Sequence, residues 1–157
     1  MTCTQRGEDK QDCTRTSVVY ESICSMCNPS SLAKGELREQ ESEAPSLYVG
    51  ETSRSIQERA LEHLGGARRG VERNHMIVHQ HLEHPGEPPS FVFKVISSHK
   101  TALNRQIKEA VRIRRRGGAA RILNARGEFN RSHITRLVVE QEEEGSKQER
   151  LHLEQVE

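Results

Sequence analysis

Aromatic side chains are scarce in this sequence, whose 157 residues include no tryptophan, two tyrosines and three phenylalanines. Only 32% of the residues are hydrophobic and 30% are charged, so the core is expected to be small and aliphatic. No apolar run approaches the roughly 20 residues needed to cross a bilayer, and the polar N-terminus does not resemble a secretory signal. We therefore expect an intracellular protein without a membrane partner. In a reducing compartment its four cysteines would be thiols or metal ligands.

Composition divides the chain into three parts. Residues 1–17 are polar and lack periodicity, which predicts a flexible leader, and residues 18–139 hold the periodic segments of a single domain. Residues 140–157 carry seven acids against two bases, which predicts a disordered acidic tail. Residues 105–131 carry nine Lys or Arg against two Glu. This basic segment favours a polyanionic partner, although a solvated helix face would give the same pattern.

Hydrophobic periodicity predicts an α+β domain with a small three-stranded antiparallel sheet flanked by helices. The predicted strands are residues 18–24, 47–51 and 91–97, with residues 134–139 as a further short strand or an extended edge. The predicted helices are residues 55–64, 74–83 and 101–116. Residues 28–46 are rich in Ser, Glu and Pro and predict a long mobile connection, across which the first two strands pair antiparallel.

Local signals refine these helices. Ser55 and Glu58 have the spacing of a capping box at the start of the first helix. The third helix is expected to bury a face formed by Leu103, Ile107, Ala110 and Val111. Residues 122–124 are expected to enter a turn after Gly117 and Gly118 end that helix.

The only two tyrosines both fall in predicted strands of the same sheet, Tyr20 in the first and Tyr48 in the second. Arg59 and His63 are four residues apart on the first helix, so both can point at one place near Tyr48. Glu109 lies in the third helix. Taken singly, each of these residues is more often structural, as a half-buried tyrosine or a member of a surface ion pair.

In their order along the chain, these segments resemble the motifs of the GIY-YIG nuclease family. The matching stretches are VVYESIC, LYVGE, the Arg and His of RALEH, RQIKEAVRI and LN, and they span about residues 18–130. Val18 stands where the first motif usually has Gly, which alters strand packing more than chemistry. Asn124 looks like the family's late Asn and would hold the strand ends in register. A CxxC pair between the tyrosine motifs also resembles the endonuclease domain of Penelope-like retrotransposons.

The resemblance implies a metal-dependent DNA endonuclease that hydrolyses or nicks a phosphodiester. The implied catalytic residues are Tyr20, Tyr48, Arg59, His63, Glu109 and Asn124. Glu109 would hold Mg²⁺ or Mn²⁺ and Arg59 would bind phosphate oxygens. Tyr20 would activate water with His63 as proton acceptor, while Tyr48 would position water or phosphate. A retroelement origin would add a nuclear location and a reverse transcriptase as a fused or cooperating partner.

Cys24 and Cys27 form the CxxC pair, and four of the eight histidines fall within residues 75–84. Two thiolates on one turn suit tetrahedral Zn²⁺, which needs two further ligands. His75 with His79, or His79 with His84, has suitable spacing; the resemblance favours His79 and His84, with His75 as a substitute. A structural zinc would pin the first strand's end to the second helix. Alternatively, Cys24 and Cys27 are buried thiols and the histidines line a polar helix face. Cys3 and Cys13 could complete another metal site, whose other ligands the sequence does not identify.

Five arginines of the basic segment are expected to contact DNA phosphates without reading sequence. They are Arg105, Arg112, Arg114, Arg115 and Arg116. The segment has no interleaved aromatic residues, which argues against base stacking on single strands. Two other functions are compatible with the sequence: a non-catalytic zinc-stabilised module that binds nucleic acid, and a DNA repair nuclease of the same type.

Overall fold

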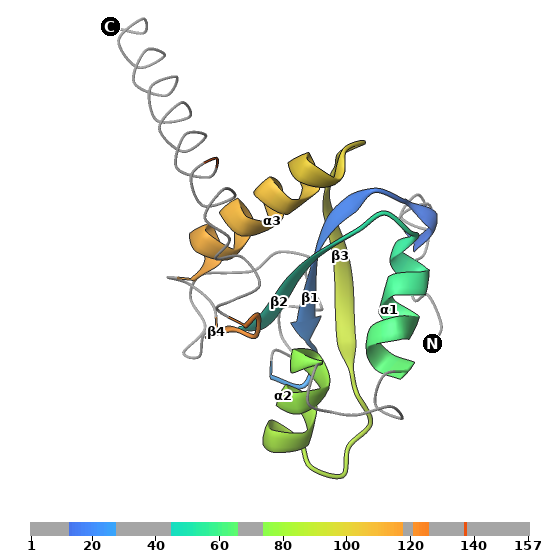
Figure 1. Ribbon diagram of the computed structural model, residues 1–157. Coiled ribbons are helices and arrows are strands. Elements are labelled where there is room, and N and C mark those ends of the chain that lie inside the picture. Colours follow the sequence, from blue (N-terminus) through green and yellow to red (C-terminus); the bar gives the residue numbers. More distant parts are fainter. Residues whose placement is uncertain (1–12, 28–44, 66–73, 118–120, 126–136, 138–157) are drawn as a thin grey trace, which may run out of the picture.

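The computed structural model of the chain describes residues 13–27, 45–65, 74–117, 121–125 and 137. They form an α+β fold with three helices and a four-stranded mixed sheet (Figure 1). The elements in chain order are β1 (Val18–Cys24), β2 (Ser46–Thr52), α1 (Ile56–Gly65), α2 (His75–Glu83), β3 (Phe91–Ser98), α3 (Ala102–Arg116) and β4 (Arg121–Ile122). Each predicted helix and each of the first three strands is present, with ends within one residue of the prediction.

The sheet has the strand order β3-β1-β2-β4. β1 pairs antiparallel with β2 on one side and with β3 on the other, which confirms the three predicted antiparallel strands. The prediction of only three strands was wrong, because Arg121 and Ile122 form a two-residue strand parallel to Ser46 and Leu47. Two residues are too few to show a strand period in the sequence.

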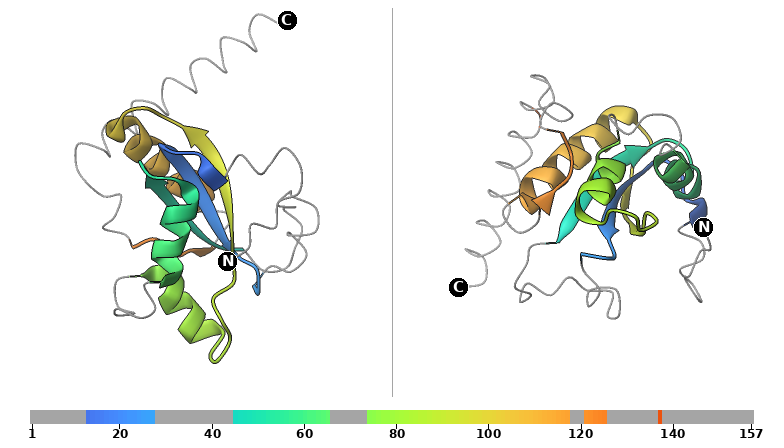
Figure 2. Two further views of the ribbon diagram at one scale, coloured as in Figure 1. Left: turned by 90° about the vertical axis from the view of Figure 1, so that its right-hand side faces the viewer. Right: turned by 90° about the horizontal axis from the view of Figure 1, so that it is seen from below.

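Helices cover both faces of the sheet, and β1 is therefore buried along its whole length (Figure 2). Alternate side chains of β1 enter two separate clusters. Val18, Tyr20 and Cys24 pack with residues of α1 and α2, whereas Val19 and Ile23 pack against Ile113 of α3 and residues of β2, namely Leu47 and Val49. The tyrosines and the CxxC pair consequently lie on the α1 and α2 side.

Side-chain caps define the starts of the helices. Ser55 and Glu58 form the predicted capping box, with Ser55 N–H donating to Glu58 Oε2 at 2.9 Å and Glu58 N–H donating to Ser55 Oγ at 3.2 Å. Asn74 caps α2 and Thr101 caps α3 by accepting hydrogen bonds from backbone amides. These caps explain why the helix starts were predictable from local residue order.

Three expectations at the margins are corrected. Residues 13–17 are not a loose leader, because the Arg15 carbonyl accepts from Ile56 N–H at 3.1 Å and Ser17 bonds to both Ser53 and His99. Leu103 is 47% exposed and does not belong to the buried face of α3. Leu137 is helical and packs against α3, so no strand is present at this residue, and the other residues of the predicted strand 134–139 lie outside the described part of the chain.

Several predicted segments lie outside the described residues. These are residues 1–12 of the leader, residues 28–44 of the long connection and residues 140–157 of the tail. Within the described part of the chain, each helix is too short or too polar to cross a membrane.

Candidate active site and metal centre

Tyr20 and His63 are in direct contact. The Tyr20 hydroxyl lies 2.8 Å from His63 Nε2, within hydrogen-bond distance. Tyr20 comes from the central strand and is fully buried, while His63 comes from the last turn of α1. The four-residue spacing of Arg59 and His63 on α1 directs both toward the tyrosines, as predicted.

Tyr48 completes an aromatic group with these two residues. Its ring centroid lies 5.2 Å from that of His63 and 6.5 Å from that of Tyr20. Gly50 lies beside both phenols, since a Cβ atom at this position would be 2.4 Å from the Tyr20 hydroxyl oxygen and 2.9 Å from Tyr48 Cε1. Only glycine leaves room here for the observed placement of Tyr20.

Arg59 lies beside this group and keeps part of its hydrogen-bonding capacity unused. Its Nη1 donates to Glu62 Oε2 at 3.2 Å, and its charge and hydrogen bonding act on Tyr20. Arg59 Nε is buried and has no hydrogen-bond partner among the described residues. A buried N–H without a partner carries a cost, and this one is suited to an anionic oxygen.

Burial and the neighbouring charges set the protonation state of Tyr20. Burial raises the pKa of the Tyr20 phenol well above its usual value of about 10, and the neighbouring Arg59 guanidinium only partly opposes this effect. Burial, reinforced by the positive charge of Arg59, lowers the pKa of His63 to about 4. At neutral pH the pair is therefore a neutral phenol and a neutral imidazole, which can accept the phenolic proton at Nε2 when its own proton is on Nδ1.

Glu109 acts on the same phenol from α3. Its carboxylate and that of Glu51 both raise the pKa of Tyr20, which places the two charges within electrostatic range of the hydroxyl. Glu51 is paired with Arg105, whose Nε lies 2.7 Å from Glu51 Oε2. Glu109 is half-buried.

Asn124 binds to the outer edge of β2 next to this group. Its Nδ2 donates to the Val49 carbonyl at 2.7 Å and its Oδ1 accepts from Val49 N–H at 2.9 Å. Asn124 thus covers the outer edge of β2 at Val49, next to the stretch of that edge that β4 covers at Ser46 and Leu47. This position agrees with the expected role of Asn124 in holding strand ends, and it is a structural contact rather than a contact with Tyr20.

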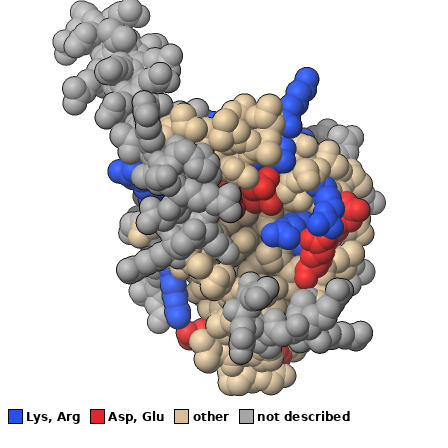
Figure 3. Space-filling view, in the orientation of Figure 1, with Lys and Arg blue, Asp and Glu red and all other residues tan. Residues whose placement is uncertain are grey.

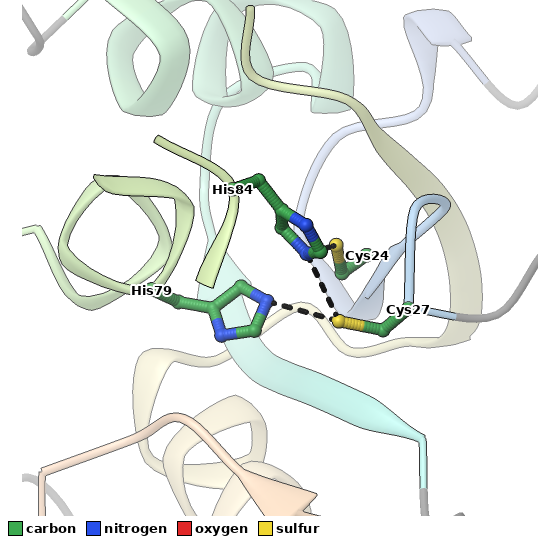
Figure 4. Close-up of side chains that lie close together, drawn as sticks. All are labelled: Cys24, Cys27, His79 and His84. Carbon is green, nitrogen blue, oxygen red and sulfur yellow. Dashed lines mark hydrogen bonds between the residues drawn. The ribbon is translucent and has the colours of Figure 1, made fainter. Parts of the chain in front are cut away.

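The second group consists of Cys24, Cys27, His79 and His84, whose ligand atoms all lie within 4.8 Å of one another (Figure 4). Cys27 Sγ is 3.1 Å from His84 Nε2 and 3.4 Å from His79 Nε2, and Cys24 Sγ is 3.5 Å from His84 Nε2. Zinc bonded at about 2.3 Å to sulfur and about 2.0 Å to nitrogen in a tetrahedron places these atoms about 3.5 Å apart. The four residues could therefore bind a metal such as zinc.

The surroundings of the metal centre also suit a cation. Burial, followed by the proximity of Cys24, raises the pKa of the Cys27 thiol, and a metal would instead favour both thiolates. Burial, followed by the charge of His84, lowers the pKa of His79, which keeps it neutral as a ligand must be. His75, the predicted substitute ligand, is not one of the four residues grouped at this centre. Cys13 packs against the hydrophobic core rather than joining the metal centre.

The comparisons with known proteins give no relatives. No family model, curated protein or solved structure matches this chain.

The arginines of α3 differ in their surroundings. Arg105 is 5% exposed, and besides Glu51 it donates to the carbonyls of His99 and Lys100. This burial argues against the predicted contact of Arg105 with DNA. Arg112 Nε and Arg116 Nε both donate to Glu21 Oε1, at 2.6 Å and 3.0 Å.

Glu21 is 1% exposed, so this pair of arginines neutralises a buried carboxylate and attaches α3 to β1. Of the predicted DNA-binding residues, Arg114 and Arg115 are exposed. On the face seen in Figure 3, the described Lys and Arg side chains are scattered, some of them next to Asp or Glu, and form no single broad basic surface.

A cavity of about 150 Å³ lies between α3 and β3. Lys108, Arg112 and Arg115 of α3 line it, together with Val19, Ile96, Ser97 and Val111. The register between β1 and β3 shifts at this point, and such a bulge can turn two consecutive residues, here Ile96 and Ser97, toward one side. Arg112 is bonded to Glu21, so Lys108 and Arg115 supply the positive charge that would favour an anion in this cavity.

Sequence reasoning missed four residues that shape these sites: Gly50, Glu21, Glu51 and Asn74. A glycine inside a strand was the available signal for a close approach at Gly50. Glu21, in a strand of otherwise hydrophobic residues, was a signal for a buried ion pair. No local signal linked Asn74 to His63 or Glu51 to Arg105, because each pair meets only in the folded chain.

Proposed function

We propose that this protein is a metal-dependent endonuclease of the GIY-YIG type that hydrolyses or nicks DNA. The observation that supports this most is the meeting of Tyr20, Tyr48, Arg59 and His63 from β1, β2 and α1. A hydrogen-bonded phenol and imidazole next to an arginine with an unused donor form a plausible centre for phosphodiester hydrolysis.

In the proposed reaction, Arg59 binds a non-bridging oxygen of the scissile phosphate through its unpaired Nε. Tyr20 orients or deprotonates the attacking water, and His63 Nε2 takes the proton from the phenol. The low pKa of His63, about 4, keeps the imidazole neutral at neutral pH, so that Nε2 can accept a hydrogen bond from the phenol. Proton transfer to this weak base requires that bound metal and Arg59 first lower the pKa of Tyr20. Tyr48 lies against His63 and limits the positions that its ring can take.

Glu109 is the residue proposed to hold Mg²⁺ or Mn²⁺. One carboxylate is sufficient for Mg²⁺, which retains most of its water ligands. When bound, the metal would offset negative charge at the phosphate and leaving oxygen and oppose the burial that raises the pKa of Tyr20. The donor chemistry fits, since a half-buried carboxylate within electrostatic range of the phenol would be stabilised by a cation.

DNA phosphates could be contacted by Arg114, by Arg115 and by Lys108 in the cavity beside α3. The guanidinium groups of Arg112 and Arg116 are bonded to Glu21, which leaves them less free for this role. We assign Arg105 to the structure and not to DNA binding, because its guanidinium is used by Glu51 and two carbonyls. A retroelement origin, a nuclear location and a reverse transcriptase partner remain part of the proposal as implied by the sequence resemblance.

The Cys2His2 group favours a second candidate, a zinc-stabilised module that binds nucleic acid without cutting it. Such a module would need the metal centre and the α3 cations but not the arrangement of Tyr20, Arg59 and His63. A repair nuclease of the same type would share the active site and differ only in the DNA structures it cuts.

Nicking of supercoiled plasmid separates these candidates. Wild type should nick in Mg²⁺ and not in EDTA, whereas Glu109→Gln and Tyr20→Phe should each lose at least about 100-fold in rate. Glu87→Gln, an exposed acid between α2 and β3, is the matched control and should retain full activity. The circular dichroism spectrum and zinc content of each variant should equal those of wild type.

Undiminished cutting by both Glu109→Gln and Tyr20→Phe would overturn the proposed mechanism. Binding of DNA by wild type without nicking, in Mg²⁺ and in Mn²⁺, would favour the non-catalytic module.

A further inference from the structure

A continuous set of contacts joins the metal centre to His63. Asn74 lies between them as the N-cap of α2, with its Oδ1 accepting from Met76 N–H at 3.2 Å and Ile77 N–H at 3.4 Å. Its Nδ2 donates to the main-chain carbonyl of His63 at 2.5 Å. One side chain therefore holds the start of α2 and the end of α1 together.

The metal centre holds the same helix from its other end. His79 lies in α2 and His84 is its C-cap, whereas Cys24 and Cys27 lie at the end of β1. β1 also carries Tyr20, four residues before Cys24 on the same side of the sheet. The contacts thus close a ring from Tyr20 along β1 to the cysteines, through the metal to α2, and back through Asn74 and His63.

We propose that Asn74 is a positioning residue, and that metal bound by the two cysteines and two histidines holds the His63 imidazole against Tyr20 through α2 and Asn74. The role of this contact in hydrolysis rests on the proposed function, but the coupling itself does not. Metal binding and the placement of His63 are coupled equilibria. Metal binding should favour the buried position of His63 by the same factor by which that position strengthens metal binding.

The surroundings of His63 make its titration a sensitive measure of its placement. Arg59 and Glu62 of α1 are the charged groups that act on it, Tyr20 and Tyr48 face it from the sheet, and Asn74 contacts it from α2. Burial is the main reason that its pKa is low, with a further contribution from Arg59, while Glu62 and the side chain of Asn74 act in the opposite direction and raise it. A ring that moves into solvent returns toward the ordinary value of about 6.5.

The decisive variant is Asn74→Ser. Serine is an equally good N-cap, so α2 keeps its start, but its shorter side chain cannot donate to the His63 carbonyl. Asn104→Ser in the exposed first turn of α3 is the matched control, because only the backbone N–H of Asn104 takes part in a described hydrogen bond.

Two measurements test the coupling. Loss of the Asn74 side chain alone would lower the His63 pKa, whereas a ring displaced into water has a higher one. NMR titration of labelled histidine should therefore show the His63 pKa rising from about 4 by one unit or more in Asn74→Ser and staying unchanged in Asn104→Ser. Chelator competition should show zinc affinity weakened about 3- to 10-fold in Asn74→Ser, the effect of losing one buried hydrogen bond, and unchanged in the control.

An unchanged or lowered His63 pKa in Asn74→Ser would overturn the positioning role, since the ring would then have stayed buried. A raised pKa with unchanged zinc affinity would overturn the link to the metal. Neither measurement needs catalysis, so a protein that shows both effects and nicks no DNA would refute the proposed function and leave this coupling in place.

Discussion

Substitution of Gly50 by alanine tests the geometry of the candidate active site. The added Cβ would lie 2.4 Å from the Tyr20 hydroxyl oxygen and 2.6 Å from Tyr20 Cζ. These distances are roughly 1 Å shorter than an ordinary non-bonded contact. The Tyr20 ring must therefore move, although it is fully buried and in contact with Tyr48, Phe93 and His63.

The expected cost of Gly50→Ala is about 1–3 kcal/mol of unfolding free energy, as for other overpacked cores. Moving the phenol by about 1 Å from His63 should also lower the proposed nicking rate by about 100-fold. The chain has two tyrosines and no tryptophan, and both tyrosines lie at this site. Intrinsic tyrosine fluorescence therefore reports this site directly, and urea unfolding followed by circular dichroism gives the stability.

Gly65→Ala is the matched control. It adds the same methyl group at the last residue of α1, where, among the described residues, no atom beyond the chain neighbours and the backbone of α1 lies within 4 Å of the new Cβ. Alanine is also the better helix former, so stability should stay equal or rise by up to about 1 kcal/mol. Wild-type stability and an unchanged fluorescence spectrum in Gly50→Ala would show that Tyr20 does not occupy the position described.

Two further predictions concern the metal centre and the buried ion pair. The protein should retain one zinc per chain after dialysis, Cys27→Ser should lose it, and Cys13→Ser should keep it; equal retention in all three would exclude the assigned ligands. Glu21→Ala should cost about 3 kcal/mol by leaving the Arg112 and Arg116 guanidinium groups without their carboxylate. Burial would raise the pKa of Glu21, but those two arginines outweigh it and lower the pKa. The contribution of Glu21 to stability is thus complete above about pH 4.3 and declines as the pH falls further. Wild type should therefore lose more unfolding free energy than Glu21→Gln as the pH is lowered. Identical acid unfolding curves for the two proteins would contradict this.

The sequence predicted the fold well where local signals determine structure. The roughly alternating residues of 18–24 located β1, and the capping box of Ser55 and Glu58 located the start of α1. It failed where structure depends on contacts between distant residues. β4 exists because it pairs with β2. Leu103 looked buried because its spacing places it on the same helix face as Ile107, but at its position in the first turn of α3 that face is exposed.

The same distinction applies to the candidate sites. The CxxC motif brings two thiolates together within one turn, so the cysteines were predictable without the fold. The choice of His84 over His75 depended on the C-cap of α2, where the chain turns back toward Cys24. Arg105 looked like its neighbours in a basic segment, and only the fold shows that it is buried beside Glu51.

Asn124 has a consequence for the association of the protein with other molecules. Unpaired backbone groups along an outer strand invite pairing with strands of other chains. The side-chain amide of Asn124 forms hydrogen bonds with both the N–H and the C=O of Val49. It therefore satisfies this residue's outward backbone groups as a paired strand residue would. A chain shortened before residue 121 would lose this cover together with β4, and β2 would be open to intermolecular sheet formation and aggregation.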